Sequence, residues 1–362
     1  MAIDGGPNLI QLLTPEGLLS EHPDHGLTLT DQQWRDRFTD LVMVRRLDTE
    51  ATALQRHGEL GLWAPCQGQE AAQVGAARAM RPTDRIFPTY REHGMAYVRG
   101  VDPATLLGLF RGTTLGGWDP AEHGFSLYTV VIGDQTLHAV GYAMGIQRDG
   151  TDDAVLVCFG DGASSQGDVA EAFVYAAVAD APVVFFCQNN QWAISEPLER
   201  QTRIPLFKRA AGYGFPGLRV DGNDVLAVEA VVTWALERAR RGEGPTLVEA
   251  FTYRMGAHTT SDDPSRYRTT AEGEAWKLKD PIERVRAHIS RSGIADPTFL
   301  AEVDARADAL GEHMRSACRV MPDPSPTSMF DHLYATDHPV VDHDRAWLTA
   351  YLASFSDSGR GH

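Results

Sequence analysis

The sequence of 362 residues, 43% of them hydrophobic, is long enough to bury a large core, so we expect a folded protein rather than a disordered chain. Its 33 basic residues against 49 acidic ones give a formal net charge of -16 at pH 7, which repels phosphate backbones and argues against nucleic-acid binding through a basic surface. The four cysteines form no CxxC pair and no segment approaches the roughly 20 apolar residues of a membrane span, so we expect a cytoplasmic protein without a disulfide framework, a structural zinc site or a membrane anchor.

The first regular element is expected to start at Thr30. Residues 1–29 are rich in glycine, proline and polar side chains, which favours an irregular arm. From Thr30, which can cap a helix, apolar residues recur at helical spacing as far as Gly58, which would end the helix. A second helix is predicted over residues 70–80, where alanine and glycine allow close packing on a neighbour.

The middle of the chain alternates between apolar runs and helical patterns. From residue 154, the runs AVLVCFG and APVVFFCQNN flank the helical segment DVAEAFVYAAV, a spacing typical of a strand, a helix and a second, parallel strand. A third run, GPTLVEAFTYRMG, follows another helical segment. This alternation predicts the α/β class, with a central parallel sheet flanked by helices.

The expected domain organisation has three parts. Residues 1–29 form the N-terminal arm, residues 30–330 the α/β domain, and residues 331–362 a C-terminal helical extension and tail. Charged helical patterns dominate beyond residue 270, and no internal repeat or low-complexity block interrupts this order.

Polar residues that can bind a metal follow two of the predicted strands. The segment GDGASSQGD begins at the end of the first strand, where Gly160 and Gly162 allow a sharp turn and Asp161 offers a carboxylate to a hard cation. The next strand ends in QNNQWAIS, so Asn190 emerges at the same sheet edge, and a main-chain carbonyl near Trp192 adds a third oxygen. Mg²⁺ completes such a set with diphosphate oxygens, although both segments could also serve only as turns.

The motif GDG, followed after about 26 residues by NN, resembles the thiamine-diphosphate motif. With its surroundings, from about Leu54 to Arg268, it resembles the α subunits of the pyruvate and branched-chain 2-oxo acid dehydrogenases. The resemblance implies the thiamine-diphosphate-binding fold and the decarboxylation of a 2-oxo acid, with thiamine diphosphate and Mg²⁺ as cofactors. Further segments that carry the resemblance are GQEAAQVGAA, IFPTYREHG, GDQTLHAVG, YGFPGLRVDGNDV and YRMGAHTTSDDPSRYR.

The resemblance also implies roles for individual residues. Tyr90 and Arg91 would hold the diphosphate, and His258 would contact it and act in catalysis by assisting the reductive acylation. Ile132 would wedge the cofactor between its two rings. The implied Mg²⁺ ligands are Asp161, Asn190 and the carbonyl of Trp192. The other implied cofactor-binding residues are Val130, Gly160, Gly162, Ala163, Gln188 and Ile194.

Two segments depart from the family pattern. Gln188 stands where some relatives place a phosphate-binding arginine, which removes one positive charge from the site. Residues 129–135 read TVVIGDQ, which differs from the sequence that carries a potassium site in branched-chain relatives, although Asp134 could support a cation there.

The implied reaction needs partners, because in this family the carboxylate beside the pyrimidine ring of the cofactor comes from a separate β subunit. The resemblance therefore implies an α₂β₂ heterotetramer, with a lipoyl-bearing acyltransferase core as the acceptor of the acyl group. No nucleic-acid or membrane partner is expected.

The expected activity is the oxidative decarboxylation of branched-chain 2-oxo acids of the 3-methyl-2-oxobutanoate type, with pyruvate as the second candidate substrate and acetoin as the third. Two hypotheses come from other classes. A non-catalytic scaffold subunit would be signalled by loss of Asp161, Asn190 or His258, and all three are present. A nicotinamide-dependent dehydrogenase would need GxGxxG directly after the first strand, and GDGASSQG spaces its glycines differently.

Overall fold

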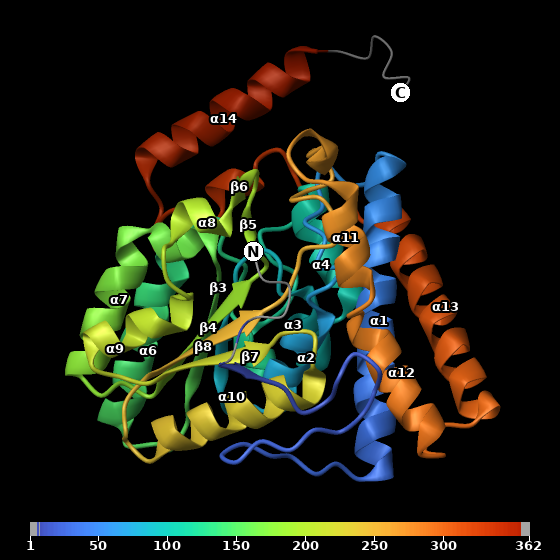
Figure 1. Ribbon diagram of the computed structural model, residues 1–362. Helices are drawn as coiled ribbons and strands as arrows, with labels where there is room; N and C mark the ends of the chain where they lie inside the picture. Colours follow the sequence, from blue (N-terminus) through green and yellow to red (C-terminus); the bar gives the residue numbers. More distant parts are fainter. Residues whose placement is uncertain (1–5, 7, 356–362) are drawn as a thin grey trace. The chain divides into compact units, whose positions relative to one another are not determined.

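The computed structural model in Figure 1 describes residue 6 and residues 8–355. The expected arm and tail also include residues 1–5, 7 and 356–362, which lie outside the described part. Within the described part, no helix combines the length and the apolar character needed to cross a lipid bilayer.

The chain divides into two compact units. The first ends at Arg319 and holds a six-stranded sheet with its covering helices. The second begins at Val320 and contains helix α14 (Pro339–Ser354). The boundaries expected after residues 29 and 330 stay a prediction.

The sheet of the first unit is parallel throughout, with strands in the order β1-β7-β8-β4-β3-β2 (Figure 1). The central strands consist almost entirely of buried residues because helices cover both faces, as is typical of parallel sheets. This architecture confirms the predicted α/β class. The strands of this sheet are β1 (Leu9–Ile10), β2 (Arg85–Phe87), β3 (Val155–Gly160), β4 (Val183–Asn189), β7 (Gly217–Asp221) and β8 (Thr246–Phe251). A separate antiparallel hairpin pairs β5 (Trp192–Ala193) with β6 (Glu196–Pro197).

The first two helices of the chain follow the sequence prediction closely. Thr30 caps α1 in a reciprocal pair of hydrogen bonds with Gln33, whose backbone N–H donates to Thr30 Oγ1 and whose side chain accepts from Thr30 N. The helix predicted over residues 70–80 is α2. The helices of the first unit are α1 (Asp31–Arg56), α2 (Glu70–Arg78), α3 (His93–Val98), α4 (Pro103–Arg111), α5 (Pro120–His123), α6 (Asp134–Asp149), α7 (Gly167–Val178), α8 (Leu198–Gln201), α9 (Arg209–Tyr213), α10 (Val225–Arg240), α11 (Thr270–Lys277), α12 (Pro281–Arg291) and α13 (Pro297–Val320).

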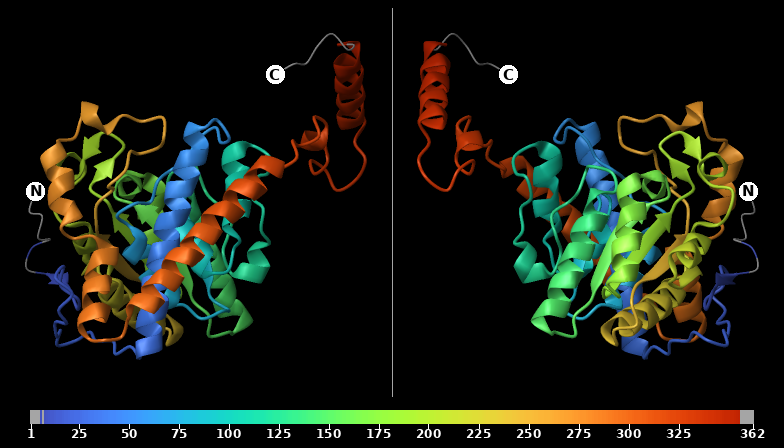
Figure 2. Two further views of the ribbon diagram at one scale, coloured as in Figure 1. Left: turned by 90° about the vertical axis from the view of Figure 1, so that its right-hand side faces the viewer. Right: turned by 90° about the vertical axis from the view of Figure 1, so that its left-hand side faces the viewer.

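Alternation along the strands divides the core into two layers. Val155, Val157 and Phe159 of β3 face α6 and α7, and the alternate residues of the strand face the other side of the sheet. There α10 packs on β4, β7 and β8 and against α2. Figure 2 shows α13 beside α1, to which it is tied by an ion pair between Arg46 and Asp308.

The strand register aligns the carboxyl ends of the central strands. Gly160, the last residue of β3, pairs with Gln188, and Asn189, the last residue of β4, pairs with Phe251 at the end of β8. Three chain segments therefore leave the sheet at one edge and at the same level.

Candidate active site

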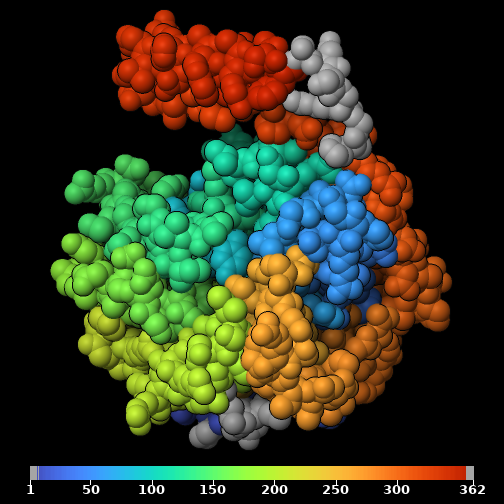
Figure 3. Space-filling model, turned by 90° about the horizontal axis from the view of Figure 1, so that it is seen from above, coloured from blue at the N-terminus to red at the C-terminus, as the bar shows by residue number. Residues whose placement is uncertain are grey.

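A cavity of about 300 Å³ lies at the carboxyl ends of β3 and β4, the edge where open α/β sheets commonly bind ligands. Figure 3 shows this unit from above, where teal, lime and orange segments from distant parts of the sequence meet. Most of the residues expected from the sequence line the cavity. They are Tyr90, Arg91, Ile132, Gly160, Asp161, Gly162, Ala163, Gln188, Asn190, Trp192, Ile194 and His258.

The turn after β3 runs close to the hairpin of β5 and β6. Asp161 and a short 3₁₀ helix, Gly162–Ser165, follow the strand directly. A Cβ atom on Gly162 would lie 2.7 Å from the Cβ of Ala193, so a larger residue would push the turn and the hairpin apart. Glycine at this position keeps the backbone of Gly162 and Ala163 at the cavity wall.

The three expected metal ligands converge at one point. One end of the Asn190 carboxamide lies 3.1 Å from the Trp192 carbonyl oxygen and 3.3 Å from Asp161 Oδ1. The other end faces Gln69, with 3.2 Å between Asn190 Nδ2 and Gln69 Oε1. The Asn190 carboxamide can take two orientations. If its NH₂ group points to Asp161, it donates to Asp161 Oδ1 and to the Trp192 carbonyl. If its oxygen points there, it forms with these two atoms a set of three oxygens that suits a hard cation.

The carboxylate of this set is unpaired. Asp161 is 1% exposed and accepts a hydrogen bond from Gln201 Nε2 at 2.9 Å, but it forms no ion pair with any residue that the structure describes. Burial raises the pKa of Asp161 to about 6. Among residues 6 and 8–355, no group of three or more His, Cys, Asp and Glu side chains could hold a metal ion, so a metal here would depend on this single carboxylate.

Arg91 is a buried cation without a carboxylate partner in the described part of the chain. Its guanidinium donates from Nη1 to the Pro65 carbonyl at 2.6 Å and from Nη2 to the His258 carbonyl at 2.9 Å. It also lies 5.4 Å from the centre of the Tyr90 ring. A guanidinium that is 6% exposed and bonded only to neutral groups is costly unless an anion joins it.

His258 lies between Tyr90 and two arginines. Arg91 Nη2 and Arg254 Nη1 approach its Nδ1 at 3.3 and 3.4 Å, and the Tyr90 hydroxyl lies 3.4 Å from its Nε2. Burial, with the charges of Arg91 and Arg254, lowers the pKa of His258 to about 3. The ring is therefore neutral at physiological pH. Because arginines only donate, Nδ1 is the acceptor and Nε2 carries the proton.

Arg254 is a lining residue that the sequence did not reveal. It is 0% exposed, and it donates to the carbonyls of Trp192 and Ile194, both at 2.8 Å. Burial and the charge of Arg91 lower the pKa of Arg254 to about 10. Arg254 thus fixes the hairpin that carries one of the three oxygens. It adds to the cavity wall a second positive charge that forms no ion pair with any described residue.

Gln188 is a buried lining residue that is held by two polar neighbours. Its Nε2 donates to Glu92 at 2.6 Å, and its Oε1 accepts from Gln73 at 3.3 Å. Burial raises the pKa of Glu92, so this corner of the cavity favours neutral groups. Gln188 is therefore a satisfied part of the wall, and it brings no positive charge.

Three of the expected residues have exposed side chains, namely Val130, Ile132 and Ile194. Val130 is 64% exposed and is not among the lining residues, whereas its neighbours Thr129 and Val131 are. Ile132 lines the cavity and is partly exposed. Ile194 also lines it and has a φ of 56°, a conformation that β-branched residues rarely adopt and that is found at functional sites.

Comparison with known proteins relates this site to one family. The profile of the family described as Dehydrogenase E1 component matches residues 39–324. The 3-methyl-2-oxobutanoate dehydrogenase subunit alpha of Mycobacterium tuberculosis is 46% identical over 354 residues, which cover 98% of this chain and 96% of the relative. The 2-oxoisovalerate dehydrogenase subunit alpha of Bacillus subtilis is 37% identical over 88% of this chain and 100% of the relative.

A pyruvate-specific name also occurs among the relatives. The pyruvate dehydrogenase E1 component subunit alpha of Staphylococcus aureus is 40% identical over 78% of this chain and 76% of the relative. The family profile spans most of the chain, and these identities extend over most of its length. The resemblance seen in the sequence is thus confirmed: the chain belongs to the dehydrogenase E1 component family, as an α subunit of the thiamine-diphosphate-dependent 2-oxo acid dehydrogenases.

Proposed function

We propose that the chain binds thiamine diphosphate through a Mg²⁺ ion held by Asp161, Asn190 and the carbonyl of Trp192. The observation that carries this proposal is the convergence of these three oxygens in a cavity that Arg91 and Arg254 also line. A divalent ion would neutralise the buried carboxylate, and phosphate oxygens would give Arg91 the anionic partner that it lacks. The charges of the cavity that find no ion-pair partner among the described residues thus match a metal diphosphate.

Other features of the cavity fit the same group. Gln69 Nε2 and Gln135 Oε1 are buried polar atoms of lining residues without a hydrogen-bond partner in the described part, so a ligand with polar groups would satisfy them. The missing Cβ of Gly162 lets the backbone line the cavity. When bound, thiamine diphosphate accepts the electrons released as a 2-oxo acid loses CO₂.

The site residues would bind and orient this group. Backbone groups of Gly162 and Ala163 would bind phosphate oxygens, and Ile132 would support the rings as an apolar wall. His258, neutral and with its proton on Nε2, would donate a hydrogen bond to the diphosphate and assist transfer of the acyl group. The other proposed contacts are Tyr90, Gly160, Gln188 and Ile194, which line the cavity, and Val130, whose two neighbours line it.

A β subunit would close the open side of the site. The relatives are named as α subunits, which implies a β partner for this chain. Val130, Val131 and Ile132 expose apolar side chains in the segment that borders the cavity, and a partner would cover them. We propose an α₂β₂ heterotetramer that passes its acyl group to a lipoyl-bearing acyltransferase core.

The proposed substrate is a branched-chain 2-oxo acid, because relatives that are 46% and 37% identical carry the names 3-methyl-2-oxobutanoate and 2-oxoisovalerate dehydrogenase. The α chain assembled with its β subunit should turn over 3-methyl-2-oxobutanoate with a kcat/KM about tenfold or more above that for pyruvate, since added methyl groups in an apolar pocket are worth that much. The measurement is steady-state turnover with each acid. A preference for pyruvate would assign the chain to the second candidate function, and no cofactor-dependent turnover would favour a scaffold subunit.

The affinity for Mg²⁺ should fall below about pH 6. Because burial raises the pKa of Asp161 to about 6, protons and the metal compete for its carboxylate in acid and do not compete above that pH. Well below the pKa, the dissociation constant should rise about tenfold per pH unit. Titration calorimetry with Mg²⁺ and thiamine diphosphate between pH 5 and 8 measures this dependence. A constant affinity across this range would argue against Asp161 as a ligand.

A further inference from the structure

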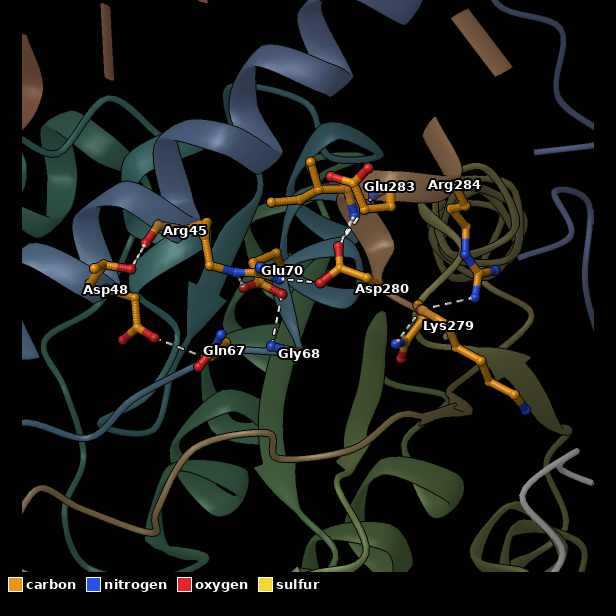
Figure 4. A network of polar contacts seen from close by, with 12 residues as sticks. Arg45, Asp48, Gln67, Gly68, Glu70, Lys279, Asp280, Glu283 and Arg284 are labelled. Atoms are coloured by element: carbon orange, nitrogen blue, oxygen red, sulfur yellow. Dashed lines mark hydrogen bonds and ion pairs between the residues drawn. The ribbon is translucent and has the colours of Figure 1, made fainter. Parts of the chain in front are cut away.

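Asp48, a buried carboxylate of α1, holds the loop of residues 63–68 by hydrogen bonds, and Figure 4 shows its contact with Gln67. Asp48 Oδ1 accepts hydrogen bonds from the indole Nε1 of Trp63 at 2.8 Å and from Cys66 N at 3.0 Å. Asp48 Oδ2 accepts from Gln67 N at 3.0 Å. Three donors of the loop therefore converge on one side chain that is closed off from water.

Carbonyl groups of the same loop accept hydrogen bonds from Arg91, which lines the cavity, and from the nearby His93. The Pro65 carbonyl accepts from Arg91 Nη1 at 2.6 Å, and the neighbouring Ala64 carbonyl accepts from His93 Nε2 at 3.0 Å. The N–H groups thus face α1, and these carbonyls face the segment that contains Arg91. A shift of the loop away from Asp48 would move the acceptor that Arg91 uses.

The far end of the loop has an anchor of its own. Glu70 accepts from Gly68 N at 2.9 Å and pairs with Arg45, which in turn donates to Asp280 at 3.0 Å (Figure 4). This second anchor does not involve the Pro65 carbonyl. Two further contacts flank Pro65, since Trp63 pairs with Thr260 and the Gln67 carbonyl accepts from Met255 N. Asp48 acts most directly on the Pro65 carbonyl, because it accepts from Cys66 N, which belongs to the same peptide group.

We propose that Asp48 is a positioning residue for diphosphate binding, which acts through the loop and the Pro65 carbonyl on the guanidinium of Arg91. This inference rests on the proposed function. The acceptors of Arg91 are two main-chain carbonyls and the ring of His258, all neutral, so no carboxylate fixes its direction. Arg91 can present its free N–H groups to phosphate oxygens only while these carbonyls stay in place.

The test uses the α chain assembled with its β subunit and inorganic pyrophosphate as the probe. Asp48→Asn keeps the size of the side chain but removes its charge and places an NH₂ group against the loop N–H groups. In excess Mg²⁺ at pH 8, we expect calorimetry to show about tenfold weaker pyrophosphate binding. The half-saturating concentration of thiamine diphosphate should rise by the same factor, with turnover at saturation changed by less than about twofold. Lower turnover with unchanged half-saturation would overturn the proposal.

Asp40→Asn is the matched control. Asp40 is a buried carboxylate of the same helix, and it pairs with Arg78 instead of the loop. Its replacement should lower thermal stability without changing the affinity for pyrophosphate. Equal weakening by both variants, or wild-type affinity in Asp48→Asn, would overturn the proposal.

A double-mutant cycle tests the route through Arg91. In an Arg91→Gln background, Asp48→Asn should weaken pyrophosphate binding no further, because the guanidinium on which it acts is already gone. Additive losses would show that Asp48 acts by another route and would overturn the proposal. If Asp48→Asn does not fold, Trp63→Phe removes the indole donor, together with part of the buried ring, and should weaken binding about threefold. Unchanged binding would again contradict the proposal.

Failure of this inference and failure of the proposed function give different results. A wild-type complex that binds neither pyrophosphate nor thiamine diphosphate in the presence of Mg²⁺ would overturn both. A wild-type complex that binds them, together with an Asp48→Asn variant that binds equally well, would overturn the positioning role alone.

Discussion

Asp161→Ala should abolish the Mg²⁺-dependent binding of thiamine diphosphate and lower turnover by on the order of a thousandfold. Asp161 is the only carboxylate among the three converging oxygens. Loss of a group that merely orients a metal ligand costs about 10- to 100-fold, so loss of the charged ligand itself should cost more. Thermal unfolding gives a direct readout, because cofactor and metal together should raise the melting temperature of the wild type by mass action and leave that of the variant unchanged.

Asp168→Ala is the matched control for this variant. Asp168 is the second aspartate of GDGASSQGD, lies in the first turn of α7 and does not line the cavity, so its loss should change turnover by less than about twofold.

Without metal, Asp161→Ala should be at least as stable as the wild type at pH 7. Burial raises the pKa of Asp161 above its value in the unfolded chain, so its ionised form destabilises the fold above about pH 6. Loss of activity through unfolding would therefore contradict the assigned role.

The meeting of Asp161 and Asn190 could be predicted because it depends on a general property of parallel sheets. Consecutive parallel strands end at the same edge, so residues that directly follow β3 and β4 must lie near each other whatever the rest of the fold does. Both strand patterns and both polar segments can be recognised in the sequence. Roles that depend only on position along a strand can thus be predicted from local pattern alone.

Arg254 could not be predicted in the same way. It lies just beyond β8, and its backbone N–H donates to the Asn190 carbonyl at 3.4 Å, so it continues alongside the end of β4. Its guanidinium then reaches the carbonyls of Trp192 and Ile194 in a hairpin about 60 residues earlier in the chain. Local periodicity contains no information about such a long-range contact. The role of Val130 rests on resemblance alone and stays a prediction, because its two neighbours line the cavity and Val130 does not.

The N-terminal arm also holds a long-range feature without a local signal. Leu9 and Ile10 form β1 and pair with Arg219 and Val220 of β7, although the glycine and proline content around them favours irregular structure. Two residues are too few to show a strand pattern. What keeps the arm on the sheet edge is the surrounding polar network, in which the backbone N–H groups of Leu12 and Leu13 donate to Asp224.

Arg284→Met should lower the free energy of unfolding by about 3–5 kcal/mol, the cost of breaking a buried ion pair by removing one partner. Arg284 of α12 is 0% exposed and donates to Asp221 at the end of β7 at 2.8 Å and to the Leu13 carbonyl of the arm at 2.9 Å. Methionine fills a similar volume but leaves the Asp221 carboxylate buried with only Gln11 and a backbone N–H as donors. Urea denaturation of the two proteins measures the difference.

Arg286→Met, two residues further along α12, tests whether the effect belongs to the buried pair. Arg286 is partly exposed and pairs with the exposed Glu283, so its loss should cost less than about 1 kcal/mol. Burial alone would raise the pKa of Asp221, but Arg284 holds this pKa below its ordinary value. The pair therefore stabilises the fold at pH values above the pKa that Asp221 has in the unfolded chain. This stabilisation is lost as Asp221 is protonated in acid. In Arg284→Met, the unpaired carboxyl should take up its proton at higher pH. The difference in unfolding free energy between the wild type and Arg284→Met should therefore be largest near neutral pH and shrink in acid. A difference independent of pH would mean that Arg284 stabilises the arm by packing and not by charge.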